Sequence, residues 1–190
     1  MSYTTDALLF NKQFVLAALT YNHDRQLLNT KVDTVIEINN LTFTYPDSDF
    51  RLFIEHLVIE SGEKIAFIGP SGSGKTTLLN LISGILSADN GSIKIDDIEV
   101  CDLNDRDCRD FRISNVGFVF QDFELLDYLS IEDNILHIYR INSSLKLNAA
   151  VKERVYLLAE SMGISEKLKR YPSELSQGER QRAAICRALL

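Results

Sequence analysis

The sequence predicts an α/β fold with a parallel sheet, and three adjoining stretches carry that prediction. Lys64 to Ile68 is a short, mostly apolar run, typical of a strand covered on both faces of a parallel sheet. The stretch GPSGSGKTT follows it directly, at residues 69–77. From Thr76 to Leu86 the leucines and isoleucines recur at helical spacing. A strand, a glycine-rich loop and a helix in this order are expected to form the centre of the fold.

Length and charge narrow the range of functions. The chain has 190 residues, enough for one domain with a sizeable core. Its net charge of −7 argues against a general nucleic-acid binder, because contacts to phosphates need a basic surface. No apolar run approaches membrane-spanning length, and the three cysteines lack metal-type spacing. We therefore expect a reduced protein of the cytosol, which would reach a membrane only through a partner.

The first part of the chain is expected to be an N-terminal extension or linker, residues 1–34. Apolar residues between Leu8 and Leu19 would line one short amphipathic helix, and Asn22 to Asp33 is polar. From Val35 onward the pattern is that of a folded domain, expected to cover residues 35–190.

The first half of this domain is expected to contain most of its β-strands. Leu41, Phe43 and Tyr45 alternate with threonines, as on a half-buried strand, and PDSD is a turn. Further strands are expected at Leu52–Ile59 and, after the first helix, at Ser92–Val100.

The rest of the chain is mainly helical. A charged helix is expected at Asn104–Arg112, and a short buried strand at Val116–Phe120 that ends at Gln121. Three more helices are expected, at Ile131–Ile141, at Ala149–Met162 and from Ser176 onward.

The glycine-rich loop matches the pattern G-x-x-x-x-G-K followed by Ser or Thr. It consists of Gly69, Pro70, Ser71, Gly72, Ser73, Gly74, Lys75 and Thr76, with Thr77 next to it. Its glycines let successive backbone N–H groups turn inward around an anion, and the following helix points its positive end at the same place. Lys75 would reach the β- and γ-phosphates of a nucleotide, and the hydroxyl of Thr76 would bind Mg²⁺. The loop alone leaves a kinase, a GTPase, a helicase and a transport ATPase open.

A second helix start carries related chemistry. Ser176 and Glu179 have the S-x-x-E spacing of a capping box. One interpretation is a well-capped helix and nothing more. The other is a second anion site, because a helix N-terminus with a serine hydroxyl and Gly178 can bind a phosphate.

Three stretches together resemble the ATP-binding cassette (ABC) ATPases. They are GPSGSGKTT, VGFVFQDFELLDYLSIEDNI and YPSELSQGERQRAAICRALL, and the resemblance spans about residues 35–190. The sequence looks most like ATPase subunits of the lipoprotein-release and macrolide-export type. The resemblance implies a P-loop NTPase with a RecA-like parallel core, an antiparallel β subdomain and a helical subdomain at about residues 122–175.

The family's site residues carry over onto matching positions. The loop would bind ATP, with Lys75 and Gln121 in the catalytic set and Thr76 and Gln121 on Mg²⁺. Tyr45 would stack on adenine; the alternative is an aromatic that packs on Phe43. Gln121 would contact Mg²⁺ and the attacking water; the alternative is a polar residue at a strand end. The signature motif, usually LSGGQ, reads Leu175, Ser176, Gln177, Gly178 and Glu179 here, and would contact the ATP of a partner subunit.

The resemblance also implies parts that the sequence does not contain. After the signature helix, family members have an apolar strand ending in Asp-Glu, which holds Mg²⁺ and polarises the attacking water, and later a histidine. All three histidines of this chain precede residue 176. We expect a truncated cassette in which the C-terminal part of the core is missing, hydrolysis is doubtful and the fold is weak on its own.

The function that follows is the ATP-binding subunit of an ABC transporter. It would bind ATP and Mg²⁺, dimerise head to tail, and dock on the cytoplasmic side of a membrane permease through about residues 122–140. Two alternatives stay open. One is a soluble ABC ATPase of the DNA-repair or ribosome-acting kind, although no coiled-coil insertion or second phosphate loop is present. The other is a non-catalytic nucleotide-binding remnant.

Overall fold

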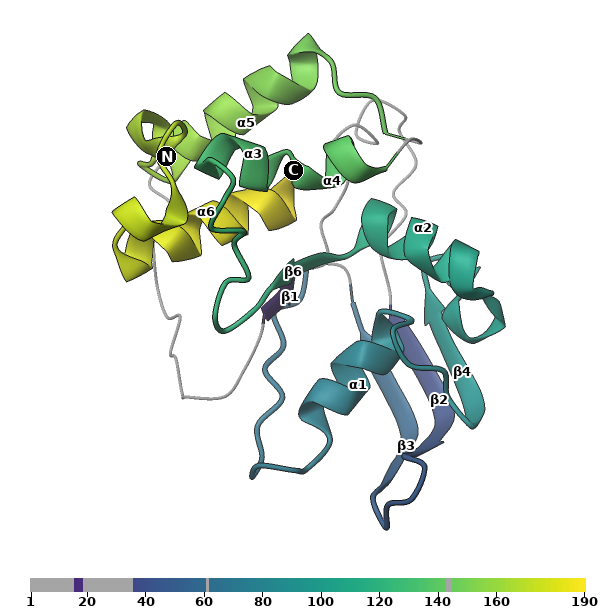
Figure 1. The fold of residues 1–190 in the computed structure, drawn as a ribbon. Coiled ribbons are helices and arrows are strands. Elements are labelled where there is room, and N and C mark those ends of the chain that lie inside the picture. The colour runs from purple at the N-terminus through teal and green to yellow at the C-terminus, as the bar shows by residue number, and fades with distance from the viewer. Residues whose placement is uncertain (1–15, 19–35, 61, 143–144) are drawn as a thin grey trace.

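The computed structural model describes residues 16–18, 36–60, 62–142 and 145–190, and everything below concerns these residues. They form two lobes, a sheet packed on helices and a group of helices, which lie on either side of the short strand β6 (Figure 1). The predicted helix between Leu8 and Leu19 lies largely outside the described residues. Its described part, Leu16–Ala18, is strand β1, so the helix prediction is wrong there.

The first lobe is built on a four-stranded antiparallel sheet with the order β3-β2-β4-β5. Its strands are β2 (Ile36–Thr44), β3 (Arg51–Ile59), β4 (Asn90–Ile95) and β5 (Ile98–Glu99). In β2 buried residues alternate with less buried ones, as the alternation of apolar and polar residues predicts. The alternation shifts by one residue between Ile38 and Leu41, where the pairing with β4 is irregular and Asn40 has a φ of 48°. That buried face packs on α1 (Lys75–Ile82) and, through Phe111, on α2 (Asp105–Asn115), with the 3-10 turn η2 (Val100–Asp102) at the sheet's edge.

The predicted strand Lys64–Ile68 is not formed. The segment has no regular secondary structure and pairs with no other described segment, and Ile68 is 94% exposed. A strand exists only through its pairing, and every pairing described in this structure is antiparallel. The expected parallel core is therefore not among the described strands. Only Phe67 of this run packs against the core of the first lobe.

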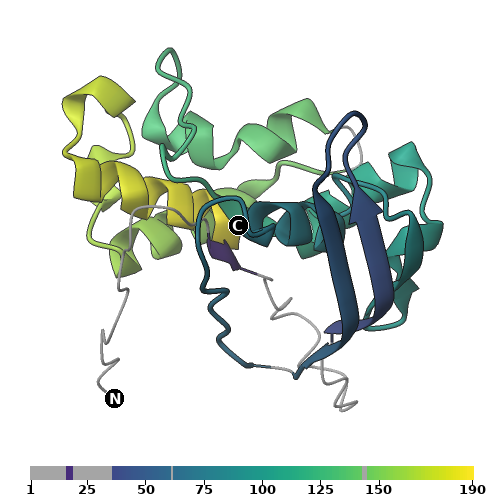
Figure 2. The same ribbon diagram turned by 90° about the horizontal axis from the view of Figure 1, so that it is seen from below.

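The second lobe is a helical unit. It contains α3 (Ile131–Ile135), α4 (His137–Ile141), α5 (Ala149–Ser161), the 3-10 turns η3 (Ser165–Lys167) and η4 (Pro172–Glu174), and α6 (Gln177–Leu189). The single helix expected over Ile131–Ile141 is interrupted at Leu136, which caps both α3 and α4. Buried residues of α3, α5 and α6 make a separate apolar core, and Figure 2 shows α6 running across this lobe.

Strand β6 (Gly117–Val119) joins the two lobes and pairs antiparallel with β1. It also lies against the end of α6. A Cβ placed on Gly117 would stand 2.2 Å from the carbonyl oxygen of Ala188, so only glycine fits at this contact. The strand that leads to the predicted Gln121 site is thereby fixed, at Gly117, next to the last turn of the signature helix.

Candidate functional site

The phosphate-type loop ends in a helix start that has no cap of its own. Gly74 is the N-cap of α1, with φ of 90° and no side chain to accept from the first turn, and no acidic residue lies in that turn. Glycine is required at this position for two reasons. The positive φ disfavours any residue with a Cβ, and a Cβ would lie 2.8 Å from the ring of Phe50. The positive end of the helix dipole therefore faces the loop without a carboxylate from the first turn.

Lys75 turns inward onto its own loop. Its Nζ donates to the carbonyl oxygens of Gly69 and Pro70, at 2.8 and 2.5 Å, and to the Oγ of Ser73 at 2.9 Å, while the residue is only 7% exposed. A buried ammonium needs such acceptors. Phosphate oxygens carry full negative charge and are stronger acceptors than carbonyls. The loop thus holds a cation ready at the place where an anion would enter.

Tyr45 stands next to this helix start. Its hydroxyl lies 3.1 Å from Oγ1 of Thr77, and its ring meets Phe43 edge to face, with 4.7 Å between centroids, and Phe50 at 5.8 Å. The packing on Phe43 is the contact that the structural alternative predicted. Tyr45 is 37% exposed, so it is not fully covered by these contacts. Stacking on adenine stays a prediction.

The two expected Mg²⁺ contacts come from separate segments. Thr76 lies in the first turn of α1 and Gln121 follows β6, and both are exposed. Ser71 and Gly72 lie on the exposed outer part of the loop, and Gly72 has φ of 80°. Within the described ranges no cluster of three or more acidic, histidine or cysteine side chains could hold a metal. The metal roles of Thr76 and Gln121 stay predictions.

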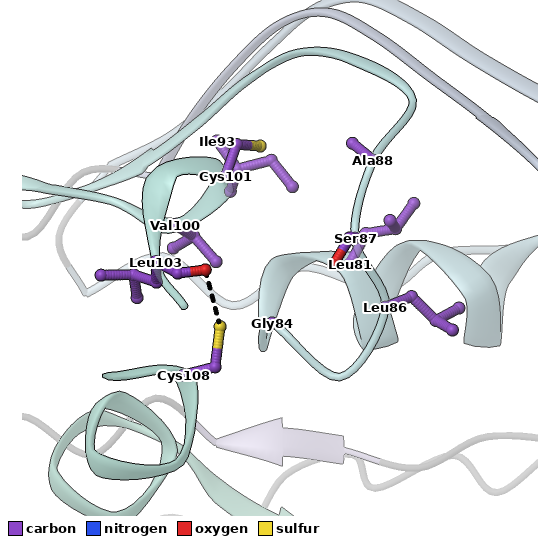
Figure 3. A pocket seen from close by; sticks show the side chains of 10 residues that line it. All are labelled: Leu81, Gly84, Leu86, Ser87, Ala88, Ile93, Val100, Cys101, Leu103 and Cys108. Atoms are coloured by element: carbon purple, nitrogen blue, oxygen red, sulfur yellow. Dashed lines mark hydrogen bonds between the residues drawn. The ribbon is translucent and has the colours of Figure 1, made fainter. Parts of the chain in front are cut away.

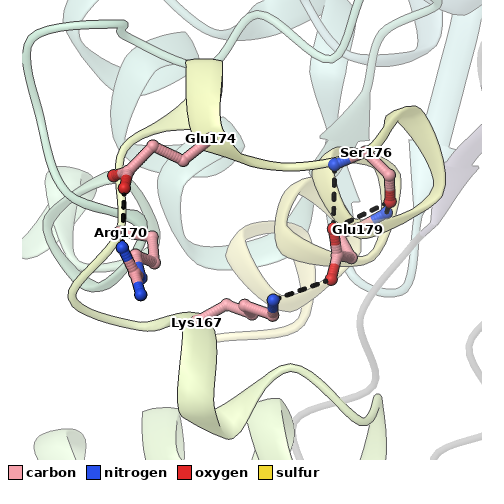
Figure 4. Close-up of polar contacts among 5 residues, drawn as sticks. All are labelled: Lys167, Arg170, Glu174, Ser176 and Glu179. Atoms are coloured by element: carbon pink, nitrogen blue, oxygen red, sulfur yellow. Dashed lines mark hydrogen bonds and ion pairs between the residues drawn. The ribbon is translucent and has the colours of Figure 1, made fainter.

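The signature stretch forms the capping box that the sequence predicts. The Oγ of Ser176 accepts from the backbone N–H of Glu179 at 3.4 Å, and one carboxylate oxygen of Glu179 accepts from the backbone N–H and the hydroxyl of Ser176, both at 2.8 Å. Figure 4 shows Lys167 beside it, with its Nζ 3.4 Å from the other carboxylate oxygen. Leu175 is buried under the turn, and Gln177 and Gly178 open α6.

These contacts lower the pKa of the Glu179 carboxyl below its usual range. The largest cause is the backbone N–H of Ser176, followed by the Ser176 hydroxyl and the charge of Lys167. The pKa of Glu174 is also lowered, first by the backbone N–H of Tyr171 and then by Arg170. Glu179 is therefore ionised at neutral pH and places a negative charge at the start of α6.

Patterns in the sequence did not reveal several residues whose contacts join distant parts of the chain. Lys167 was not singled out, nor was Arg187, which donates to the carbonyl oxygens of Phe123 and Glu124. Asn134 was missed as well; it is fully buried and holds the segment from Leu126 to Ser130. An asparagine between isoleucines on an apolar helix face was one available signal, and an arginine within the apolar run AAICRALL was another. Lys167 lies in an ordinary charged stretch, which gives no such signal.

Two cavities lie away from the loop, and neither has the features of a nucleotide-binding site. One, of about 10 Å³, lies behind α1 and is lined largely by apolar residues with Cys101 and Cys108 at its edge (Figure 3). That volume suits about one water. A shallow groove of about 390 Å³ lies on the helical lobe between α5 and η3 and has two lysines and two glutamates among its lining residues. All three cysteines are free thiols.

The loop has the sequence and the helix-start geometry of a P-loop NTPase. The chain belongs to the ABC transporter family, whose model matches residues 55–190. A bacitracin export ATP-binding protein of Halalkalibacterium halodurans is 41% identical over 132 residues, 70% of this chain and 51% of that protein. A thiamine import ATP-binding protein of Shigella boydii is 37% identical over 156 residues, 82% of this chain and 62% of that protein.

Solved structures agree with the family. A dimeric ATP-binding cassette in a post-hydrolysis state with ADP and Pi superposes with a TM-score of 0.67 at 31% identity, covering 81% of this chain and 68% of that one. A cassette of Clostridium perfringens that is part of a cbiONQ transporter complex gives 0.70 at 27% identity, covering 83% and 61%. The predicted class is therefore confirmed. An exporter and an importer are both among the relatives, so the lipoprotein-release and macrolide-export subtype stays a prediction.

The chain spans 51% and 62% of the lengths of the two curated relatives described above. In the part of the chain that the structure describes, no helix is long and apolar enough to cross a bilayer.

Proposed function

We propose that this chain is the nucleotide-binding part of an ABC transporter ATPase and that it binds MgATP at residues 69–77. The observation that carries the proposal is the buried ammonium of Lys75, held by loop carbonyls at the uncapped start of α1. Phosphates would replace carbonyl acceptors with charged ones, and the helix dipole would act on the same anion. The loop residues fit the group that the family implies.

The other predicted site residues would each contact the nucleotide, the metal ion or the attacking water. The exposed hydroxyl of Thr76 would take a position on Mg²⁺, which would neutralise phosphate charge when bound, and Gln121 would orient a water. Tyr45 would present its ring to the base. Ser176 and Gly178 would contact the nucleotide of a second cassette in a head-to-tail dimer. Hydrolysis would need a water-activating carboxylate in addition to these residues.

Nucleotide binding is tested directly by calorimetry with ATP and Mg²⁺ on the full chain. Lys75→Ala is expected to weaken binding at least about 100-fold, because it removes a charge-assisted contact to the phosphates. Lys64→Ala is the matched control, since Lys64 is an exposed lysine just before the loop. Equal affinities of Lys75→Ala and the unchanged protein would overturn the proposal.

We further propose that about residues 122–140 dock on a membrane permease, at the cytoplasmic face of the membrane. Tyr128 in this face is 75% exposed, so its side chain is accessible to a partner. Tyr128→Ser is expected to reduce co-sedimentation with permease-containing membranes while leaving nucleotide affinity unchanged. Tyr156→Ser, at an exposed tyrosine of α5, is the control, and equal losses for both variants would refute this docking face.

A further inference from the structure

We infer that Arg187 is a positioning residue that locks the turn after Gln121 onto the last turn of the signature helix. The inference rests on the proposed function only in the role it gives to Gln121. The contacts that carry the inference join Arg187 of α6 to residues 123–124. These residues lie more than sixty positions from Arg187 in the sequence.

The guanidinium of Arg187 holds two consecutive carbonyl groups at once. Its Nη1 donates to the carbonyl oxygen of Glu124 and its Nη2 to that of Phe123, both at 2.6 Å. The planar fork of arginine suits two acceptors side by side, which a lysine could not match. Burial lowers the pKa of Arg187, yet an arginine stays charged at neutral pH, so both bonds are charge-assisted.

The turn that Arg187 holds is strained. Phe123 and Glu124 have φ of 62° and 46°, so two successive residues with a Cβ lie in the left-handed region. That region is unfavourable for such residues unless other contacts hold them there. Within the turn the backbone N–H of Phe123 donates to the carbonyl of Phe120 at 3.0 Å. The fork of Arg187 supplies the contact that keeps both carbonyls on one side.

Gln121 lies between two points fixed on the end of α6. On one side Gly117 abuts the carbonyl of Ala188, and on the other Phe123 and Glu124 are held by Arg187. The segment beyond the turn is held independently by Asn134, which accepts from the N–H of Leu126 at 2.7 Å. Both points lie on the last turn of α6, so the residues around Gln121 are tied to the helix that Ser176 caps at its other end.

The test compares three arginine variants by hydrogen exchange of the amides at residues 121–127 in the full chain without nucleotide. Arg187→Met is expected to speed exchange of the Phe123 amide by about tenfold or more, since hydrogen bonds to charged groups are among the strong ones. Arg187→Lys is expected to behave like Arg187→Met, and it carries the comparison if the methionine variant does not fold. Arg154→Met is the matched control, because Arg154 donates to the carbonyl of Leu189 on the same helix end without touching the turn.

A rescue experiment separates the lock from general destabilisation. Glycine adopts positive φ freely, so adding Glu124→Gly to Arg187→Met is expected to bring exchange back to within about threefold of the unchanged protein. Glu124→Ala removes the same carboxylate but keeps the Cβ, and is expected not to rescue. Unchanged exchange in Arg187→Met, equal loosening in Arg154→Met, or rescue by alanine as good as by glycine would each overturn the inference.

A functional readout distinguishes this inference from the proposed function. If Gln121 acts on Mg²⁺, Arg187→Met should reduce the gain in ATP affinity that Mg²⁺ gives, while binding without Mg²⁺ is retained. Arg154→Met should leave that gain unchanged. If Lys75→Ala binds ATP normally, the proposed function fails even where the exchange data uphold the lock; if the Mg²⁺ gain survives in Arg187→Met, the positioning role fails alone.

Discussion

The N-termini of α1 and α6 are both proposed to contact phosphate, but the side chains around them carry opposite charges. At α1 the cap is Gly74, no side chain caps the first turn, and the ammonium of Lys75 lies among loop carbonyls. At α6 the Ser176 hydroxyl and the Glu179 carboxylate satisfy each other's backbone groups, and Lys167 balances the charge. One helix start lacks an anion and the other already contains one.

This difference separates what each end can do alone. An anion entering at α1 would meet a positive dipole and a buried cation, so we expect a single chain to bind it. An anion approaching α6 meets the negative charge of Glu179, whose contacts to Ser176 would have to rearrange or be shared. We therefore expect the start of α6 to bind only a ligand that is already held elsewhere, as in the proposed head-to-tail dimer.

Among the changes that compare the two helix starts, the largest effect is expected from damage to the loop's backbone. Gly74→Ala places a Cβ at positive φ and 2.8 Å from the Phe50 ring, so it should lower ATP affinity more than about tenfold and destabilise the fold by about 1–3 kcal/mol. Gly163→Ala is the matched control, because Gly163 also has positive φ but nothing lies within 4 Å of its Cβ position. Calorimetry and urea unfolding measure both. Similar affinities for the two variants would show that the loop's shape does not matter.

Removal of the serine at the second helix start should separate stability from binding. Ser176→Ala is expected to cost about 1 kcal/mol of unfolding free energy, as for other lost caps, while ATP affinity at low protein concentration stays unchanged. Asn148→Ala removes a cap of the same kind from α5. Only the serine variant should impair ATP-dependent dimerisation in analytical ultracentrifugation. A loss of monomer affinity in Ser176→Ala would mean that both helix ends serve one nucleotide in the same chain.

Acid titration tests the role of the Glu179 carboxylate at the start of α6. Because the pKa of Glu179 is lower in the folded protein than in the unfolded chain, its stabilising contribution is present above the unfolded value and is lost as pH falls through the folded value. Lys167→Met should raise the pKa of Glu179 slightly, since Lys167 is a smaller cause than Ser176. Carbon-detected NMR titration measures this. A Glu179 pKa at the ordinary value would contradict the capping box.

The smallest effect is expected at the aromatic beside the loop. Tyr45→Phe removes only the bond to Thr77 and should leave ATP affinity within about twofold, whereas Tyr45→Leu should lower it several-fold if the ring stacks on adenine. Comparing ATP with inorganic triphosphate shows whether the loss depends on the base. Equal losses for both ligands would favour the structural alternative, in which Tyr45 packs on Phe43.

Local patterns predicted the parts of this fold that depend on neighbouring residues. The alternation around Leu41 and Phe43 gave β2, and the S-x-x-E spacing gave the capping box at Ser176. Both are decided within one strand or one helical turn, so the sequence records them directly.

The predictions that failed depend on partners distant in the chain. Lys64–Ile68 reads as a buried strand, but a strand needs a neighbour to pair with, and the structure describes none there. The helix from Ile131 was predicted without its break at Leu136. The bonds of Arg187 join residues 63 and 64 positions apart, and such contacts leave no periodic trace in the sequence.

The most direct test of the difference between the two helix ends is hydrogen exchange with Mg²⁺ and a slowly hydrolysed ATP analogue at two protein concentrations. At low concentration, nucleotide is expected to protect residues 69–77 and to leave residues 176–180 unchanged. Protection of residues 176–180 should appear only as the protein concentration rises and a second chain presents its nucleotide. Protection of residues 176–180 that is independent of protein concentration would contradict the account.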